Sequence, residues 1–564
     1  MPNLIDVPRQ AFKKLPAKIQ QYVDRGVAEF HYLRKIIEAG GLQLEPPQNY
    51  VAMVADMRRW GEIGMLPAVV ARRTPHRVAI IDDEGSMTYQ ELDNAANAVA
   101  HGLLAQGVRA GDGVAILARN HRWFLIANFG CARVGARIIL LNSEFAGPQI
   151  KEVAEREGAQ LIIYDDEYTA AVSAAEPPLG KLRALGVNPD SDQASGSTDE
   201  TLADVIARSS EAPAPKAAKH AAIIILTSGT TGTPKGANRS TPPTLAPVGG
   251  ILAHVPFKAG EVMLLPSPMF HALGYMGATL AMFLGSTLVL RRRFKPATVL
   301  ADIEKYQVNG VIVVPVMLSR VLDAWEKTAT ELGARPDLSS LRIMFVSGSQ
   351  LGADLASRAL KDLGPVVYNM YGSTEVSFAT IASPKDLMFN PSTVGPVVSG
   401  AKVKIFDDNG QELPRGEIGR IFVGNTFPFH GYTGGGGKQI INGLLSSGDV
   451  GYFDEHGLLY VSGRDDEMIV SGGENVFPAE VEDLISGHPD VVEATAIGVE
   501  DNEWGARLRA FVVKKPDAAL DEEAIKLYVR EHLARYKVPR EVLFLDELPR
   551  NPTGKILKRE LRKL

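Results

Sequence analysis

The residues best suited to chemistry stand between positions 226 and 236, where hydroxyl and glycine residues run together and a lysine follows. The segment reads Leu-Thr-Ser-Gly-Thr-Thr-Gly-Thr-Pro-Lys-Gly and comes directly after the apolar run 223–226. Glycines leave backbone N–H groups uncovered, serine and threonine add hydroxyls, and Lys235 adds a positive charge. This combination predicts a loop that binds the phosphates of a nucleotide.

The loop differs from two common phosphate-binding patterns. A Walker A loop needs serine or threonine directly after a Gly-Lys pair, whereas Lys235 follows Pro234 and precedes Gly236. No Gly-x-Gly-x-x-Gly sequence opens the first predicted strand–helix–strand unit either. A run of serine, threonine and glycine alone is often only a flexible connection. The Pro-Lys-Gly that follows favours the phosphate-binding interpretation.

Other short segments combine turn residues with reactive side chains. They are Tyr-Asn-Met-Tyr-Gly-Ser-Thr-Glu at 368–375, Ser-Gly-Asp-Val-Gly at 447–451, Gly-Arg-Asp-Asp-Glu-Met-Ile-Val-Ser-Gly-Gly-Glu-Asn-Val-Phe-Pro at 463–478, and Asn-Pro-Thr-Gly-Lys at 551–555. Glu375 offers a carboxylate oxygen suited to Mg²⁺, and Tyr371 offers a flat face for a nucleotide base. Asp449 can accept both hydroxyls of a ribose. Lys555 lies in a basic tail and would, by itself, be assigned to solubility.

Together with the loop at 226–236, these segments resemble, in the same order, the signature motifs of the adenylate-forming superfamily. That superfamily includes acyl-CoA synthetases, beetle luciferases and the adenylation domains of peptide synthetases. The similarity extends from about Pro67 to Arg559. The long N-terminal segment outside it resembles those of some actinobacterial fatty-acyl-CoA ligases. The resemblance therefore implies an AMP-forming acyl-CoA synthetase.

The resemblance also implies a role for each matched residue. Lys555, Lys235 and Glu375 would be catalytic, and Thr227 and Glu375 would hold Mg²⁺ bound to ATP. The residues implied in binding ATP and AMP are Thr227, Ser228, Gly229, Thr230, Thr231, Gly232, Gly348, Asn369, Tyr371, Gly372, Ser373, Thr374, Asp449 and Arg464.

Three further roles follow from the same resemblance. Asp466 stands at the hinge about which the C-terminal domain would rotate. Ser471, Gly472 and Gly473 would face the pantetheine arm of CoA, because glycine permits close backbone approach. His271, in Pro-Met-Phe-His-Ala at 268–272, matches an aromatic motif beside the acyl group. We expect it to shape the acyl site rather than act as a base, because a carboxylic acid is already ionised at pH 7.

These motifs require a framework of strands, and the apolar pattern predicts one. Short apolar runs at 114–117, 138–141, 161–164, 223–226, 311–314 and 343–346 are typical of strands covered by helices on both faces. A capping box at Thr88–Glu91 opens a helix, and another is expected around Trp123–Val134. The predicted fold class is α/β, with a large N-terminal adenylate-forming domain of several subdomains and mixed sheets, followed by a small α+β C-terminal domain.

The predicted domains are an N-terminal helical extension at 1–60, an AMP-binding domain at 61–465, and a mobile C-terminal domain at 466–564. After residue 465 the chain mixes shorter strands, at 491–513, with an exposed charged helix at 521–534. The stretch 177–215 is rich in alanine, serine, aspartate and proline, and is expected to include a surface excursion rather than a second core.

Composition excludes several classes of protein. The 564 residues carry a net charge of −6, so no global basic field suggests nucleic acid as a partner. The one cysteine, Cys131, cannot form an intramolecular disulfide and argues against a cysteine-based zinc site. The expected location is cytoplasmic.

No apolar run is long enough to span a membrane. The basic, helical stretch 11–42 is expected to dock on its own domain, and contact with a membrane surface stays an open alternative.

The expected function is ATP-dependent activation of a medium- or long-chain fatty acid to an acyl-AMP, followed by transfer to CoA with release of AMP and pyrophosphate. The expected partners are the acid, ATP and CoA, and a homodimer is left open. One alternative is an acyl-AMP ligase that loads a carrier protein, and another is a ligase of aryl or other acids with CoA. A non-catalytic nucleotide-binding protein is disfavoured because Lys555, Glu375 and Asp449 are all present.

Overall fold

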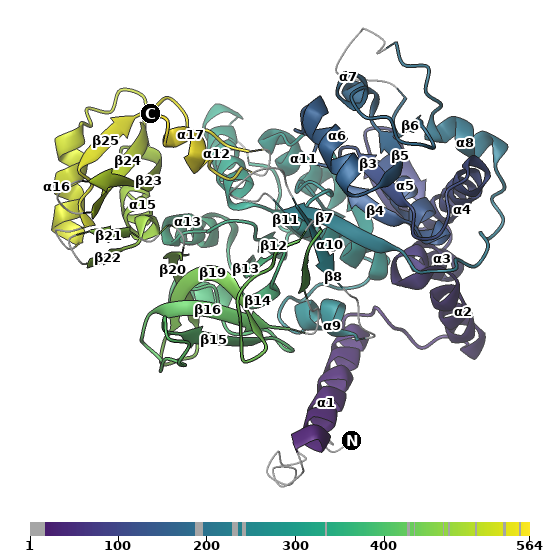
Figure 1. The fold of residues 1–564 in the computed structure, drawn as a ribbon, viewed down its shortest axis with the longest axis horizontal. Coiled ribbons are helices and arrows are strands. Elements are labelled where there is room, and N and C mark those ends of the chain that lie inside the picture. Colours follow the sequence, from purple (N-terminus) through teal and green to yellow (C-terminus); the bar gives the residue numbers. More distant parts are fainter. Residues whose placement is uncertain are drawn as a thin grey trace.

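A mostly parallel eight-stranded sheet forms the centre of the molecule (Figure 1). The computed structural model describes residues 17–186, 196–227, 235–239, 244–332, 335–425, 429–433, 435–465, 467, 469–471, 474–501, 505–533, 537–551 and 554–564. In spatial order the eight strands are β14 (Ser377–Ala382), β13 (Val367–Ser373), β12 (Ile343–Val346), β11 (Gly310–Val313), β9 (Val262–Leu264), β10 (Thr287–Val289), β1 (Val78–Asp82) and β2 (Gly85–Thr88). Strands β13 to β1 run parallel, and the two edge strands run antiparallel to their neighbours.

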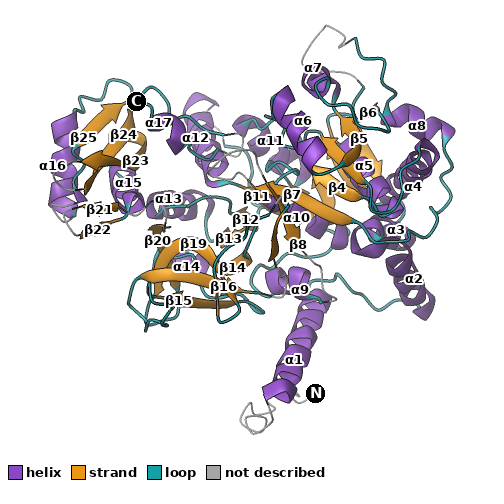
Figure 2. Cartoon of the chain, in the orientation of Figure 1, coloured by secondary structure: helices purple, strands orange, loops and turns teal. Residues whose placement is uncertain are grey.

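A second sheet, of seven strands, carries the start of the phosphate loop. Its order is β17 (Phe429–Tyr432), β8 (Lys235–Arg239), β7 (Ala222–Thr227), β4 (Arg137–Leu140), β3 (Gly113–Leu117), β5 (Ala159–Tyr164) and β6 (Lys181–Arg183). Helices stand between and around these sheets (Figure 2). They are α3 (Leu66–Arg73), α4 (Tyr89–Gln106), α5 (Arg122–Val134), α6 (Gly147–Arg156), α7 (Thr169–Val172), α8 (Leu202–Arg208), α9 (Ala246–Leu252), α10 (Ala272–Phe283), α11 (Pro296–Tyr306), α12 (Pro315–Leu332) and α13 (Ala353–Leu363).

Two smaller sheets complete the chain. The first contains β15 (Lys402–Phe406), β16 (Gly419–Gly424), β19 (Leu444–Phe453), β18 (Ile440–Ile441) and β20 (Leu459–Arg464), and α14 (Pro384–Phe389) precedes it in sequence. The second contains β22 (Glu474–Val476), β21 (Ile469–Ser471), β24 (Gly505–Lys514), β23 (Val491–Asp501) and β25 (Glu541–Phe544), with α15 (Pro478–Ser486), α16 (Glu522–His532) and α17 (Lys558–Leu561). This last group stands apart at one end of the molecule (Figure 1) and is called the small domain below. The predicted fold class is confirmed.

The capping box predicted from the sequence is present at the start of α4. Thr88 and Glu91 form the capping box, in which Glu91 N–H donates to Thr88 Oγ1 at 3.2 Å and Thr88 N–H donates to Glu91 Oε2 at 2.7 Å. The apolar face of α4 is buried against α5 and α3. Cys131 lies in α5 with no exposed surface, and burial raises the pKa of its thiol to about 12.

The stretch 177–215 contributes more to the fold than a surface excursion would. Its first part supplies edge strand β6, which pairs parallel with β5. Leu202 and Val205 of α8 are buried against α4, and a Cβ added at Gly102 would lie 2.2 Å from Cγ1 of Val205. Parts of the stretch that was expected to include a surface excursion therefore belong to the first core, through β6 and α8. Residues 187–195 lie outside the described part.

The N-terminal extension forms α1 (Ala17–Glu38) and α2 (Pro47–Gly64), and α1 projects away from the body (Figure 1). Tyr32 and Ile36 of α1 are buried. Tyr32 packs closely on Gly249 of α9, because a Cβ added to Gly249 would lie 2.3 Å from the Cβ of Tyr32. Phe30 of α1 is 62% exposed, so the apolar residues of this helix do not all face the protein. Within the described ranges, we find no helix with the length and apolarity that a membrane span requires.

Candidate active site

The predicted site residues gather where parallel strands end. The phosphate loop follows β7, the segment with Ser347 and Gly348 follows β12, and the segment with His271 follows β9. The carboxyl ends of parallel strands share one edge of a sheet, which is where α/β enzymes bind ligands. The fold therefore brings motifs that are far apart in sequence to the same side of the two large sheets.

Glu375 sits at the tip of the hairpin formed by β13 and β14. Ser373 pairs with Ser377 across this hairpin, and the chain turns between them. The Ser373 hydroxyl lies 2.9 Å from Glu375 Oε2 and 3.2 Å from the Glu375 backbone nitrogen. Gly372 permits the turn, because an added Cβ would lie 1.9 Å from the carbonyl oxygen of Ser377. The hairpin thus fixes both the backbone and one carboxylate oxygen of Glu375.

The other carboxylate oxygen of Glu375 is held from a different sheet. Tyr432, the last residue of β17, donates its hydroxyl to Glu375 Oε1 at 2.7 Å. The Nζ of Lys235 lies 5.9 Å from the centre of the Tyr432 ring, within the range of a cation–π contact. Burial, and then Glu375, raise the pKa of Tyr432, so it remains a hydrogen-bond donor at neutral pH. Tyr432 connects the predicted metal ligand to the lysine that ends the phosphate loop.

Thr433 anchors the start of β8, which leaves the phosphate loop. Its hydroxyl accepts from Gly236 N–H at 3.0 Å, and its own N–H donates to the Gly236 carbonyl at 2.8 Å. The hydroxyl of Thr433 also donates to Glu157 Oε1 at 2.6 Å, and Glu157 is buried. An added Cβ at Gly236 would lie 2.7 Å from Thr433 Oγ1, so glycine is required there. The sequence analysis did not identify Glu157, Tyr432 and Thr433 as site residues. The run of glycines directly after Thr433 was the one signal that could have pointed to this segment.

Asp449 lies at the predicted ribose position, between two donors. Tyr371 donates its hydroxyl to Asp449 Oδ2 at 2.6 Å, and Arg464 Nη1 donates to Oδ1 at 3.1 Å. Strand pairing between β19 and β20 sets Asp449 directly opposite Arg464. Burial raises the pKa of Asp449, while Arg464 and then Tyr371 favour its charged form. Each oxygen keeps a second lone pair, so the carboxylate can still accept from a ribose.

The floor beside this aspartate is formed by the ends of β12 and β13. The Ser347 hydroxyl donates to the carbonyl of Met370 at 2.8 Å. Gly348 has φ +98°, a conformation that strongly favours glycine, and an added Cβ would lie 3.1 Å from Val314. Asn369 is buried on β13 and borders a cavity of about 700 Å³ between the β15–β20 sheet and the small domain.

His271 lies in an apolar setting at the start of α10. Its ring is 4.4 Å from that of Phe270, and burial lowers the pKa of His271 to about 4. Its Nε2 atom is buried and has no hydrogen-bond partner among the described residues. Asn120, which follows β3, fixes this segment by accepting from Met269 N–H at 2.9 Å and donating to the Ser267 carbonyl at 2.9 Å. A neutral imidazole in this position can line an acyl site, and Asn120 is a positioning residue that the sequence did not reveal.

Lys555 lies in a tight turn of the small domain that contacts the large domain. Asn551 Oδ1 accepts from Lys555 N–H at 2.9 Å, and Gly554 N–H donates to the Asn551 carbonyl at 2.8 Å. Gly554 has φ +77°, and an added Cβ would lie 2.1 Å from Cγ1 of Val316. Val316 belongs to the first turn of α12, directly after β11, so this turn packs at the carboxyl edge of the eight-stranded sheet. The side chain of Lys555 is exposed there.

Several predicted positions cannot be placed. Ser228, Gly229, Thr230, Thr231, Gly232, Asp466, Gly472 and Gly473 lie outside the described residues. Thr227 and Ser471 are placed as the last residues of β7 and β21, but their side chains are not described. Thr374 lies between Ser373 and Glu375 in the hairpin.

Mg²⁺ is compatible with the residues around Glu375. Across the described part of the chain, no group of three or more histidine, cysteine, aspartate or glutamate side chains could hold a metal by itself. Mg²⁺ commonly uses one or two protein carboxylates and takes its remaining ligands from phosphates and water. A single oriented carboxylate beside a phosphate loop suits a metal that arrives with ATP.

A large α/β body followed by a small C-terminal domain is the arrangement of solved adenylate-forming enzymes. The sequence profile of AMP-binding enzymes matches residues 68–433, and the profile of the AMP-binding enzyme C-terminal domain matches residues 480–555. The chain belongs to the AMP-binding enzyme family.

Relatives of known activity cover nearly the whole chain. A feruloyl-CoA synthase from Amycolatopsis sp is 34% identical over 524 residues, which span 90% of this chain and 99% of that protein. A fatty acid–[acyl-carrier-protein] ligase from Streptomyces coeruleorubidus is 31% identical over 508 residues, which span 87% and 94%. The solved o-succinylbenzoate CoA synthetase from Bacillus subtilis, in complex with its acyl-adenylate, matches with TM-score 0.75 and 28% identity over 88% and 97% of the two chains. The class that fold and relatives define is an adenylate-forming acid–CoA ligase.

Proposed function

We propose that the protein activates a carboxylic acid of apolar character with ATP and transfers the acyl group to CoA, releasing AMP and pyrophosphate. A medium- or long-chain fatty acid is the first candidate substrate. The observation that carries the proposal is the packing of the Lys555 turn against Val316, at the same edge of the sheet as Glu375. That packing supports a role for Lys555 as a cation that the small domain supplies to a nucleotide site on the large one.

In the first half-reaction, the acid's carboxylate attacks the α-phosphorus of ATP and pyrophosphate leaves. Lys235 and Lys555 stabilise the negative charge that moves onto the pyrophosphate. Asp449 and Arg464 orient the ribose, and Tyr371 and Asn369 bind the adenine. Mg²⁺ bound with ATP would be held by Glu375 and the hydroxyl of Thr227, and would neutralise phosphate charge. The chain contributes mainly positioning and charge.

In the second half-reaction, the CoA sulfur attacks the carbonyl of the mixed anhydride and AMP leaves. The small domain rotates about Asp466, withdraws Lys555 and brings the segment Ser471–Gly473 to the adenylate. The same site then serves two geometries in succession, and the domain movement separates them. The present arrangement, with the Lys555 turn against α12, fits the first half-reaction.

The character of the acid follows from the surroundings of His271. Its imidazole is neutral, its Nε2 is buried, and Phe270 and Tyr275 beside it are buried as well. Such a lining suits an apolar chain or ring and disfavours a second charged group on the substrate. The relative with the highest identity given above acts on feruloyl groups, so an aryl acid is the second candidate.

The acceptor has an alternative as well. The relative from Streptomyces coeruleorubidus is a ligase of fatty acids with an acyl carrier protein, so a carrier-protein thiol is the alternative to CoA.

One panel of assays tests acid and acceptor together. Pyrophosphate release is measured with saturated fatty acids of increasing length and with hydroxycinnamic and benzoic acids, each with no acceptor, with CoA and with a phosphopantetheinylated carrier protein. We expect fatty acids to give turnover that depends on CoA and yields AMP. Turnover confined to aryl acids would replace the first candidate by the second. ADP and free phosphate as the stoichiometric products would overturn the proposal.

A further inference from the structure

The connector between β20 and β21 joins the large domain to the small one, and its two ends are held by different bodies. On the near side, Asp465 N–H donates to the Gly448 carbonyl at 3.0 Å, and Arg464 is bound to Asp449. On the far side, Glu467 Oε2 lies 2.7 Å from Nζ of Lys558 in α17. Asp465 is thus held by the large domain, whereas the side chain of Glu467 is held by the small domain. Glu467 N–H also donates to the Arg464 carbonyl at 3.2 Å.

Lys558 is itself fixed within the small domain. Its Nζ lies 2.9 Å from Glu482 Oε1, and that oxygen also accepts from Thr495 Oγ1 at 2.8 Å and from Ala496 N–H at 2.7 Å. The Lys558 side chain is only 19% exposed. Burial opposes its charge, but Glu482 and Glu467 outweigh this effect and raise the pKa of Lys558. The ammonium therefore stays charged and joins the connector to Glu482 of α15, which in turn is bonded to β23.

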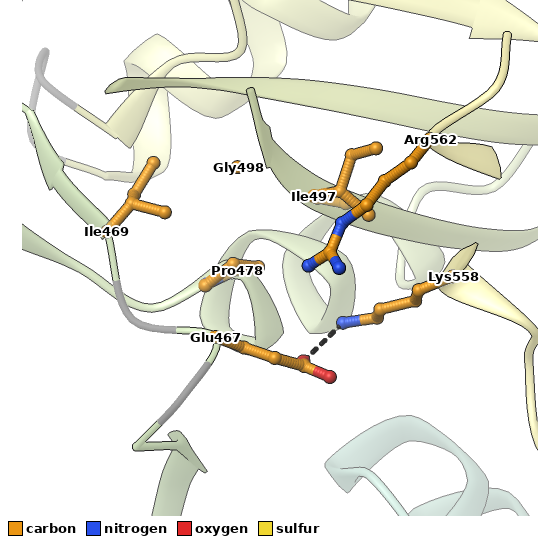
Figure 3. Close-up of a pocket in the computed structure, with 8 residues that line it drawn as sticks. Glu467, Ile469, Pro478, Ile497, Gly498, Lys558 and Arg562 are labelled. Atoms are coloured by element: carbon orange, nitrogen blue, oxygen red, sulfur yellow. Dashed lines mark hydrogen bonds and ion pairs between the residues drawn. The ribbon is translucent and has the colours of Figure 1, made fainter. Parts of the chain in front are cut away.

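Figure 3 shows this contact at a small cavity of about 60 Å³, where Lys558 reaches toward Glu467. Arg562 of the same C-terminal segment points toward the same cavity (Figure 3). Lys558 stands three residues after Lys555, and Leu561 at the end of α17 is fully buried in the small-domain core. Lys555 and Lys558, which binds Glu467, thus lie close together in the same C-terminal segment of the small domain.

We propose that Lys558 is a positioning residue that clamps the connector to the small domain through Glu467. The clamp confines rotation to the position between Asp465 and Glu467, so that Lys555 returns to one defined place at each adenylation step. Without it, the first residues beyond the hinge would loosen from the small domain, and the swing of Lys555 would be less well defined. This inference rests on the proposed two-step reaction.

The test combines hydrogen–deuterium exchange with single-turnover kinetics on the full chain. Glu467→Gln is the first variant, because it removes the connector's charge and leaves the Lys558–Glu482 contact intact. The ion pair becomes at most a weaker hydrogen bond to a neutral amide, so we expect exchange in the peptide with Glu467 and Ile469 to rise about 10-fold. Exchange in β23 and β24 should stay unchanged. Adenylation should slow about 10-fold, with the KM for ATP unchanged, because neither residue touches ATP.

Three further variants make the result specific. Lys558→Met should reproduce the local rise in exchange, and Lys558→Arg, which keeps a charged donor, should restore behaviour close to wild type. Lys563→Met is the matched control, because Lys563 is 64% exposed and pairs only with Glu560 among the described side chains. It should change neither exchange nor rate.

Two outcomes would overturn the clamp. One is unchanged exchange at the connector in Glu467→Gln, and the other is a rise spread over the whole small domain, which would mean a merely structural ion pair. If exchange rises at the connector but the protein activates none of the acids tested, the clamp is supported and the proposed function fails. The exchange readout therefore separates the two.

Discussion

The hydroxyl of Tyr432 donates to Oε1 of Glu375 at 2.7 Å, while the ring of the same tyrosine lies 5.9 Å from Nζ of Lys235. One side chain from β17 therefore orients the carboxylate predicted to bind Mg²⁺ and contacts the lysine predicted to bind phosphate. The adjacent Thr433 holds Gly236 through two hydrogen bonds. Tyr432 and Thr433 together fix the distance between the end of the phosphate loop and the tip of the β13–β14 hairpin.

Tyr432→Phe should slow adenylation about 10-fold, the scale of one hydrogen bond to a charged group. The ring and its contact with Lys235 remain, so the loss reports the orientation of Glu375 alone. Tyr452→Phe is a suitable control, because Tyr452 stacks on Tyr460 at 5.1 Å on a different sheet. The measurement is pyrophosphate release at saturating ATP. Equal rates for Tyr432→Phe and wild type would show that Ser373 suffices to orient the carboxylate.

Glu375→Gln should weaken the dependence of turnover on Mg²⁺, because one charged ligand becomes neutral while size is kept. The expected result is a magnesium titration shifted to higher concentration together with a lower maximal rate. Binding of Mn²⁺–ATP, followed by electron paramagnetic resonance, gives a readout that does not depend on turnover. An unchanged titration would contradict the metal role of Glu375.

Lys555→Ala should slow adenylate formation by roughly 100-fold or more, the scale of losing one preorganised electrostatic group. The same variant, supplied with synthetic acyl-AMP, should transfer the acyl group to CoA at close to the wild-type rate, because the rotated domain carries Lys555 away. Gly473→Leu should show the opposite pattern by obstructing the pantetheine arm. Single-turnover kinetics of each half-reaction distinguish the two. Equal slowing of both halves in Lys555→Ala would contradict domain alternation.

His271 should leave no limb in the pH profile of activity between pH 5 and 8, because its pKa is lowered to about 4. It should instead affect stability. Between pH 6.5 and 4 the unfolded chain binds a proton at this histidine that the folded chain does not, so stability falls as the pH falls. With the pKa lowered from 6.5 to about 4, the free energy of unfolding at pH 5 should be about 2 kcal/mol lower than at pH 7. His271→Asn should lack this slope when unfolding by urea is compared at the two pH values.

The sequence predicted the strands that carry the site because their apolar runs are continuous and short. The run 343–346 coincides with β12, and the run 114–117 differs from β3 by one residue at one end. The runs that became β4, β7 and β11 differ from the observed strands by one residue at each end. The turn motifs were assigned by resemblance to the superfamily, and Gly372 and Gly348 stand where the backbone of these turns needs glycine. Such requirements are local, so they are visible without the fold.

Contacts between distant segments could not be predicted in the same way. Tyr432 reaches Glu375 from another sheet, and Asn120 fixes the segment before His271 across a sequence distance of well over 100 residues. Lys558 looked like part of a basic tail, yet it is largely buried between two glutamates. Each of these depends on how sheets and domains meet, for which neither periodicity nor a turn motif gives a signal.

The burial of Cys131 has a practical consequence for following the domains in solution. Its thiol has no exposed surface and stays protonated at neutral pH, so it should not react with maleimides or nitroxide reagents. Cysteines introduced at exposed sites such as Asp408 in the large domain and Glu523 in the small one would therefore be the sole labelled positions. Fluorescence energy transfer or dipolar spectroscopy could then record the separation of the two domains in a chain that keeps its native cysteine.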